Sequence, residues 1–317
     1  YFEFEPLQAL HEIISEHNRI DLKENPSALA IGAHACVPPI VPVFQSRILR
    51  EDCRHRVEIT KSGATIEVSK EFPQRMPRYL DRPVKDRETW NDYKRRLDPY
   101  SPDRWPLEWD SFVRDWNSRD VPTMLLLEGF FMCLREFTGI ENLLFMFYDD
   151  PKLIEEMLDQ VLYLEMEIVR RACKYLRIDI VRISEDIAYR SGPLISPNMV
   201  RRFLVPRYKK IVELIHKHGI DIIQMDSDGN INELIPIWLE VEFNFVWPLE
   251  VAAGMDAIEL RKRYGTQLTL SGNLDKRLFT KGKEAIHEEV MSKVPFLLRT
   301  GGYFPCLDHL VSPDISL

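Results

Sequence analysis

Two aspartates, Asp226 and Asp228, stand directly after the apolar run Ile220–Met225 and before Gly229-Asn230. The run is rich in β-branched residues, which predicts a buried strand. Two carboxylates at the end of a buried strand are costly unless a metal ion, a cationic side chain or a bound ligand compensates their charge. Asp and Gly also favour turns for local reasons, so simple turn formation is the alternative interpretation.

Polar and acidic residues follow the other apolar runs of the chain in the same way. The residues that come directly after these runs are Glu128, Glu185-Asp186, Asp226 and Asp228, Glu250, Asn273 and Asp275, and Asp308-His309. In a (β/α)8 barrel the carboxyl ends of the strands converge on one rim, where such enzymes place their chemistry. We therefore expect these side chains to gather around one mouth.

The elements that must position these residues alternate from residue 121 onward. The expected strands are Thr123–Leu127, Ile178–Ile183, Ile220–Met225, Phe243–Val246, Leu268–Leu270 and Tyr303–Leu307. The expected helices are Pro151–Tyr175, Ser196–His218, Ile231–Glu240, Asp256–Tyr264 and Gly282–Leu298. Repeated strand–helix units imply parallel strands covered by helices. A doubly wound open sheet is the alternative, but no Gly-rich phosphate loop follows any run.

The first 120 residues have a different pattern. Tyr1–Asn25 predicts an amphipathic helix, and Ser27–Ile40 predicts a first strand that continues into a loop. Arg56–Phe72 alternates apolar and polar residues on both sides of Ser62-Gly63, which predicts a β-hairpin outside the main sheet.

A helix near Asp86–Leu97 and a cluster of tryptophans complete this part of the chain. We expect the tryptophans to hold a long loop onto the body, with a lid over a pocket as the alternative. The predicted fold is thus an α/β protein, a (β/α)8 TIM barrel whose main part is 121–317. An N-terminal helical and β-hairpin extension, 1–120, packs on it within a single domain.

Composition narrows the class of protein. The chain has 317 residues, of which 45% are hydrophobic and 29% charged, enough for a soluble globular core. A net charge of −8 without a Lys/Arg block argues against nucleic-acid or anionic-membrane partners. No apolar run has the length of a membrane span, and no signal peptide is recognisable. The five scattered cysteines favour reduced thiols in a cytoplasmic protein.

Several stretches of the C-terminal two thirds resemble the uroporphyrinogen decarboxylase superfamily. They are Phe137–Leu158, Glu185–Ile211, Asp226–Ile231, Ser271–Phe279 and Gly301–Asp314. The Arg-rich opening motif of true porphyrinogen decarboxylases is not recognisable. The sequence looks closer to a second branch, the methyltransferases that pass a methyl group between a corrinoid and an acceptor such as a thiol.

The resemblance also implies a metal site. Enzymes of the methyltransferase branch bind zinc with a His-x-Cys pair after one strand and a Cys after the last strand. The pair falls on Asp226 and Asp228 here, and the third position falls on His309. Two carboxylates and an imidazole form a harder site, suited to Zn²⁺, Mn²⁺ or Fe²⁺ and to an oxygen-bearing substrate. The alternatives are direct action on a ligand without metal, or helix capping by the aspartates beside an ordinary rim histidine.

Further rim residues receive roles from the same resemblance. Glu185, Asp186 and His309 are candidate catalytic residues, and Tyr189 is a candidate hydrogen-bond donor or proton carrier. The candidate substrate-binding residues are Glu128, Glu250, Arg190 and Asn273. The alternatives are a surface ion pair between Asp186 and Arg190, a helix N-terminal acid at Glu128, and a structural turn at Asn273.

The expected function is methyl transfer between a small oxygen-bearing substrate or thiol and a corrinoid (cobalamin) carried by a partner protein. Zn²⁺ or another divalent metal is the other candidate cofactor, and a homodimer is one candidate assembly. A decarboxylase of a polycarboxylate is the alternative, with Arg182, Arg190 and Arg299 as the candidate basic residues. A non-catalytic ligand-binding barrel is the third candidate function. In that case we expect the acids at the rim to be mutually paired and the pocket to be closed.

Overall fold

The computed structural model describes residues 33–36, 39–72 and 76–309. The predicted helix Tyr1–Asn25 lies outside these residues, as does the greater part of the predicted segment Ser27–Ile40. Four residues of that segment, Ala33–Cys36, form strand β1.

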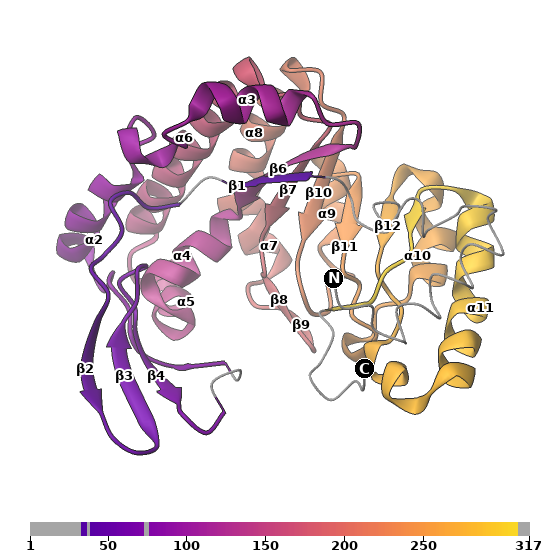
Figure 1. The fold of residues 1–317 in the computed structure, drawn as a ribbon, viewed down its shortest axis with the longest axis horizontal. Coiled ribbons are helices and arrows are strands. Elements are labelled where there is room, and N and C mark those ends of the chain that lie inside the picture. Colours follow the sequence, from indigo (N-terminus) through magenta and orange to yellow (C-terminus); the bar gives the residue numbers. More distant parts are fainter. Residues whose placement is uncertain (1–32, 37–38, 73–75, 310–317) are drawn as a thin grey trace.

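A parallel sheet of seven strands forms the centre of the described molecule (Figure 1). Its strands after β1 are β6 (Thr123–Glu128), β7 (Ile180–Ser184), β10 (Ile222–Asp226), β11 (Phe245–Trp247), β12 (Thr269–Ser271) and β13 (Tyr303–Phe304). Their order across the sheet follows their order along the chain, and every neighbouring pair is parallel. This is the strand order of a (β/α)8 barrel, as predicted. Among the described residues β1 and β13 are the two edges of the sheet.

The helices fall between the strands at the expected places. They are α4 (Phe130–Thr138), α5 (Ile140–Asp149), α6 (Pro151–Tyr175), α7 (Pro197–Met199), η4 (Val200–Leu204), α8 (Val205–Lys217), α9 (Ile235–Glu240), α10 (Ala257–Tyr264) and α11 (Lys283–Thr300). The predicted helix Ser196–His218 is one continuous helical stretch, but η4 is a π-helical turn that ends two residues before Pro206. Proline has no backbone N–H to donate, so the regular hydrogen-bond pattern changes there.

Helix α6 shows how the sequence pattern becomes packing. Its Leu/Ile/Met stripe, including Leu153, Ile154, Met157 and Val161, is buried in the main hydrophobic core. An apolar stripe at this spacing occupies one face of a helix. The stripe is therefore core packing, as expected.

A second, antiparallel sheet projects from the barrel beside α4 and α5 (Figure 1). Its strands are β2 (Arg47–Glu51), β3 (His55–Ile59), β4 (Thr65–Ser69) and β5 (Arg78–Asp81). The predicted hairpin is β3 and β4, paired antiparallel outside the main sheet. The two flanking strands, β2 and β5, were not predicted.

The tryptophan-rich segment packs on α6 through α2 (Arg87–Tyr93), η2 (Lys94–Leu97), η3 (Pro102–Arg104) and α3 (Trp109–Asn117). Trp90 is fully buried, and its Nε1 donates to Glu156 Oε1 over 3.0 Å. Trp116 is 1% exposed, and its Nε1 donates to the carbonyl oxygen of Arg177 over 2.8 Å. These contacts attach the segment to the body, which is the interpretation we favoured over a lid.

Two general features of the described residues complete the fold. The cysteines at positions 53, 133, 173 and 306 are all free thiols. No helix in the described part of the chain combines the length and the apolar character that crossing a membrane requires.

Candidate functional site

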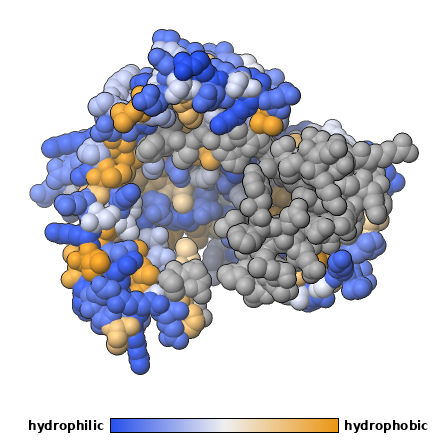
Figure 2. All heavy atoms as spheres, in the orientation of Figure 1, coloured by the Kyte–Doolittle hydropathy of each residue, from blue (hydrophilic) through white to orange (hydrophobic). Residues whose placement is uncertain are grey.

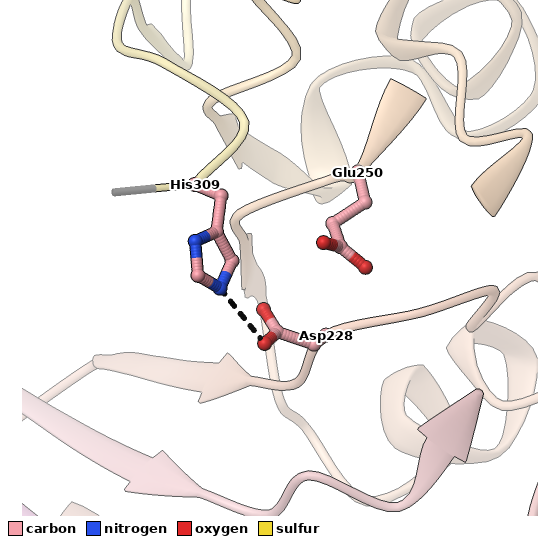
Figure 3. A group of neighbouring side chains, drawn as sticks. All are labelled: Asp228, Glu250 and His309. Carbon is pink, nitrogen blue, oxygen red and sulfur yellow. Dashed lines mark hydrogen bonds and ion pairs between the residues drawn. The ribbon is translucent and has the colours of Figure 1, made fainter. Parts of the chain in front are cut away.

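Three side chains from three different strand ends meet at the carboxyl-terminal rim of the sheet (Figure 3). Asp228 follows β10, Glu250 follows β11 and His309 follows β13. The Nε2 atom of His309 lies 3.2 Å from Oδ2 of Asp228. One ligand atom from each of the three residues can be chosen so that all lie within 4.8 Å of one another. We call Asp228, Glu250 and His309 the rim triad.

The electrostatics of the rim triad favour a cation. Burial raises the pKa of the Asp228 carboxyl, and the neighbouring carboxylates of Asp186 and Glu250 raise it further, while His309 opposes them. Within the described residues, neither Asp228 nor Glu250 forms an ion pair with a lysine or arginine. A divalent ion would remove the repulsion between the carboxylates.

The loop after β10 holds Asp228 in place through Gly229. The amide of Gly229 donates to Glu250 Oε2 over 2.8 Å, which links the two carboxylates of the rim triad. Gly229 has a φ of +83°, and a Cβ there would lie 2.7 Å from the carbonyl carbon of Ala188. Glycine is therefore required, both for its backbone conformation and for this close approach.

The donor set of the rim triad fits a divalent metal. Three ligands about 2.1 Å from one ion lie at most about 4.2 Å from one another, so a small contraction would bring the triad onto a common ion. Two carboxylates and one imidazole suit Zn²⁺, Mn²⁺ or Fe²⁺ and leave coordination positions open. The side chains of the triad are partly exposed, at 32% for His309 and 38% for Asp228.

Asp226, predicted as a metal ligand, lies outside the rim triad, and Glu250 joins it instead. Asp226 is the last residue of β10 and accepts a hydrogen bond from Ser184 Oγ over 3.2 Å. Burial raises its pKa to about 7, with Arg182 acting against the rise and Asp186 adding to it. Its carboxyl can thus exchange a proton near neutral pH.

Asp186 is held beside Asp228 by an arginine that the sequence did not single out. Arg135, on α4, donates through Nη2 to Oδ2 of Asp186 and through Nη1 to its carbonyl oxygen, both over 3.0 Å. The other carboxylate oxygen, Oδ1, accepts from the amide of Asp228 over 3.3 Å. The ion pair of Asp186 is therefore with Arg135 and not with Arg190, the partner considered from sequence.

Glu185, a candidate catalytic residue, occupies a structural position. It is fully buried, and Oε2 accepts from the amides of Phe131 and Met132 in the first turn of α4, over 2.8 and 3.1 Å. The other oxygen, Oε1, accepts from the hydroxyl of Tyr208. Burial raises its pKa to about 7, despite these donors. A carboxylate so engaged serves the N-terminus of a helix and does not face the rim.

Tyr189 and Arg190 lie on a short hairpin above the rim. Its strands are β8 (Ala188–Tyr189) and β9 (Gly192–Pro193). Tyr189 is 69% exposed, and its carbonyl oxygen accepts from the amide of Asn230 over 2.9 Å. Arg190 is exposed and forms no ion pair within the described chain. The structure thus brings neither side chain into the rim triad.

The two remaining candidates differ in position. Asn273 is 1% exposed; its Oδ1 accepts from the amide of Ala257, and its Nδ2 donates to the carbonyls of Leu249 and Met255. All these bonds are structural, which matches the alternative interpretation of this turn. Glu128 ends β6, and its pKa is raised by burial and by the carboxylates of Glu136 and Asp186. It therefore lies on the Asp186 side of the rim.

Several polar residues lie inside the barrel, and of these only Arg182 was named from sequence, as a basic residue for the decarboxylase alternative. Arg182 donates through Nε to Gln224 Oε1, and its guanidinium carbon lies 4.9 Å from the ring centroid of Trp247. Cys306 lies nearby, with Sγ 3.2 Å from Ser271 Oγ, and burial raises the pKa of its thiol. The available signal was the two-residue alternation of each strand, which puts Arg182 on the same face as Ser184.

The surface is hollowed in the middle of the view of Figure 2, in the region where Figure 1 draws α4 and the β8–β9 hairpin. Hydrophilic residues form part of this hollow. The parallel sheet, the acidic rim and the open hollow define a barrel of the enzyme type, with its polar groups at the carboxyl ends of the strands.

Comparison with known proteins gives the family. The family model for uroporphyrinogen decarboxylase (URO-D) matches residues 73–317. The chain belongs to the URO-D family, and its fold is the predicted TIM barrel. A solved structure, a methyltransferase from Methanosarcina mazei, matches with a TM-score of 0.56 and 15% identity over 92% of this chain and 80% of that one. No curated protein matched the sequence.

Proposed function

We propose that this protein is a metal-assisted methyltransferase that moves a methyl group between a small oxygen- or sulfur-bearing substrate and a corrinoid carried by a partner protein. The observation that carries the proposal is the rim triad, in which Asp228 and His309 stand at two of the positions where the methyltransferase branch resembled by the sequence holds its metal. The fold likeness to a protein described as a methyltransferase supports it. A homodimer and a cytoplasmic location stay predictions.

The rim triad would hold the ion, with Asp228, Glu250 and His309 each giving one ligand atom. A bound divalent ion supplies a Lewis acid that favours the ionised form of an alcohol or thiol. Gly229 orients Glu250 through its amide, and Asp186 orients the backbone of Asp228. Such supporting hydrogen bonds fix the direction of metal ligands.

Asp226 is placed to hold a proton beside this site. Its carboxyl is partly buried, its pKa is about 7, and it interacts electrostatically with Asp228. A group with a pKa near the working pH is an efficient general acid or base. In the proposed reaction, Asp226 accepts the proton that the substrate hydroxyl or thiol releases.

Within the described residues, the three arginines considered for the decarboxylase alternative do not gather at the rim. Of the three candidate arginines, only Arg182 faces the barrel interior, since Arg190 is exposed. Arg299 is exposed in the last turn of α11, before β13, and thus at the opposite end of the barrel from the rim. Binding of a polycarboxylate requires several cationic side chains, and these three arginines do not surround a common substrate position.

Metal analysis tests the proposal first. The purified protein is expected to contain about one Zn, Mn or Fe per chain by inductively coupled plasma mass spectrometry. Asp228→Ala and His309→Ala are expected to lose the metal, and Asp226→Asn, a matched change two residues from Asp228, is expected to keep it. A metal-free parent protein under metal-replete expression would contradict the proposed site.

Methyl transfer is tested next. The metal-loaded protein is incubated with methylcobalamin and a panel of alcohols, carboxylic acids and thiols, and demethylation is followed by the cobalamin absorbance. Turnover that Asp228→Ala abolishes supports the proposal. The proposal would be contradicted if the metal-loaded protein transferred no methyl group from methylcobalamin to any acceptor of the panel. It would also have to transfer none from a methyl ether or thioether to reduced cobalamin.

A further inference from the structure

Arg182 occupies an unusual position for a charged side chain. It belongs to β7, in register with Gln224 of β10 and Leu126 of β6, on the face of the sheet that also bears Ser184. Its guanidinium lies against the ring of Trp247, from β11, at 4.9 Å. Burial lowers its pKa, but a guanidinium keeps its charge at any ordinary pH.

The charge of Arg182 has no anionic partner within the described protein. Its Nε donates to the amide oxygen of Gln224, which is neutral, and its two Nη atoms make no hydrogen bond there. No carboxylate oxygen of the described residues lies within 4.0 Å of it, although Asp226 acts on it electrostatically. A largely buried cation of this kind is costly unless an anion pairs with it.

Asp226 is the acid with the largest electrostatic effect on Arg182, but its hydrogen bond is with another residue. Its Oδ2 accepts from Ser184 Oγ over 3.2 Å, on the neighbouring strand. Asp226 interacts electrostatically both with Arg182 and with Asp228. In the register of β7 and β10, Arg182 lies level with Gln224 and Ser184 lies level with Asp226. Along the strand direction, Asp226 therefore lies between Arg182 and Asp228 of the rim triad.

We infer that Arg182 and Trp247 form a carboxylate-binding subsite inside the barrel, which takes the acid group of a small organic acid. The free Nη atoms of Arg182 match the two oxygens of a carboxylate, as in the bidentate pairs that guanidinium groups form. The ring of Trp247 offers a flat apolar wall for the carbon skeleton beside that group. Gln224 fixes the guanidinium from the side of Nε.

The inference also narrows the substrate class, and this part rests on the proposed function. A molecule held at Arg182 by its acid group presents its other end toward the rim triad. The substrates would then be small monocarboxylic acids with a hydroxyl, methoxyl or thiol at the far end. The subsite itself is a property of the protein without metal, so it can be tested separately.

The test is calorimetric titration of the full chain with benzoate and with its neutral isostere benzamide, in the presence of EDTA. The parent is expected to bind benzoate roughly tenfold more tightly than benzamide, which is the ratio typical of one charge-assisted pair. Arg182→Gln is expected to lower benzoate affinity to the level of benzamide and to leave benzamide affinity unchanged. Arg277→Gln, which removes an exposed guanidinium bound to Asp275, is the control and is expected to change neither.

Two results would overturn the subsite. One is equal affinity of the parent for benzoate and benzamide. The other is benzoate binding that requires added Zn²⁺ or Mn²⁺ and disappears in His309→Ala but not in Arg182→Gln, since the acid would then bind at the rim triad. If Arg182→Gln does not fold, Arg182→Lys replaces it, with an intermediate loss expected because lysine keeps the charge without the paired donors. Loss of methyl transfer alone would leave these titrations unchanged.

Discussion

The imidazole Nε2 of His309 lies 3.2 Å from Oδ2 of Asp228, although 81 positions separate the two residues along the chain. The parallel sheet explains this contact, since β10 and β13 end at the same rim. Glu250 comes to the same place from β11, between them in the sheet.

Metal binding is expected to stabilise the folded protein through the rim triad. A ligand present at a hundredfold excess over its dissociation constant adds about 2.7 kcal/mol to the free energy of unfolding. For a chain of this size that corresponds to a Tm increase of roughly 5 °C. Scanning calorimetry with EDTA and with added Zn²⁺ or Mn²⁺ measures it. The increase is expected to vanish in Asp228→Ala and to persist in Asp226→Asn; an equal increase in all three proteins would assign the metal elsewhere.

Arg135 is expected to control metal affinity without touching the metal. It neutralises Asp186, whose Oδ1 accepts from the amide of Asp228. In Arg135→Met the unpaired Asp186 would repel the Asp228 carboxylate and release its backbone, and metal affinity would fall by roughly 10- to 100-fold. Competition with a chromogenic chelator measures this. Arg82→Met, which breaks the ion pair of Arg82 with Glu136, the residue after Arg135 in α4, is the matched control. Equal affinities of the Arg135 and Arg82 variants would refute the coupling.

Glu185 is expected to make the stability of the protein decrease as pH rises. Its pKa increases from an ordinary 4.5 to about 7 in the folded state. Between these values the unfolded chain loses the proton and the folded chain keeps it, so rising pH favours unfolding. The resulting decrease in the free energy of unfolding is absent below pH 4.5 and complete above pH 7, where it is about 3 kcal/mol.

The variant Glu185→Gln removes this titration. The free energy of unfolding of Glu185→Gln minus that of the parent is expected to increase by up to about 3 kcal/mol from pH 5 to pH 8. This increase is expected whatever the size of the difference at any single pH. Urea denaturation at several pH values gives the trend. Glu213→Gln, at an exposed carboxylate paired with Lys217, is the control and should show no comparable rise. A flat difference for Glu185→Gln would mean that this carboxyl is already ionised at pH 5.

Gly129 is expected to be irreplaceable for steric reasons alone. Its φ is −70°, which any residue adopts, but a Cβ would lie 2.3 Å from Glu185 Oε2 and 2.5 Å from the carbonyl oxygen of Ser184. Gly129→Ala should therefore lower the free energy of unfolding by about 1–3 kcal/mol through overpacking. Gly219→Ala has open space around it and a φ of +77°, so it reports the conformational cost alone, about 1 kcal/mol. A fully stable Gly129→Ala would show that α4 does not begin against Glu185.

The repeating elements could be predicted from sequence because their signals are local. Helix α6 has the predicted bounds, and α10 begins after Asp256, whose side chain accepts from the amides of Ile258 and Glu259. The hairpin β3–β4 follows from alternation around its turn. The flanking strands β2 and β5 carry mostly exposed side chains, so the apolar pattern that marks a strand is weak in them.

The site was predictable as a rim, and less so as a set of ligands. Asp228 and His309 were both singled out, but Glu250 was expected to bind substrate, and its approach to Asp228 depends on the amide of Gly229. Asp226 is still part of β10, in register with Ser184 and Trp247, whereas Asp228 lies beyond the strand. Whether Asp226 or Asp228 lies beyond the strand depends on where the hydrogen-bonded pairing of β10 ends. The sequence defines such strand ends poorly. Arg135 acts across 51 positions, a separation that no local pattern reports.

The loop that carries Asp228 is in contact with the β8–β9 hairpin, because the backbone of Gly229 lies against that of Ala188 and the amide of Asn230 donates to the carbonyl oxygen of Tyr189. A displacement of the hairpin would consequently displace the loop that carries Asp228 as well. Pressure on the exposed ring of Tyr189 would therefore be transmitted by contact to Asp228, which we propose as a metal ligand.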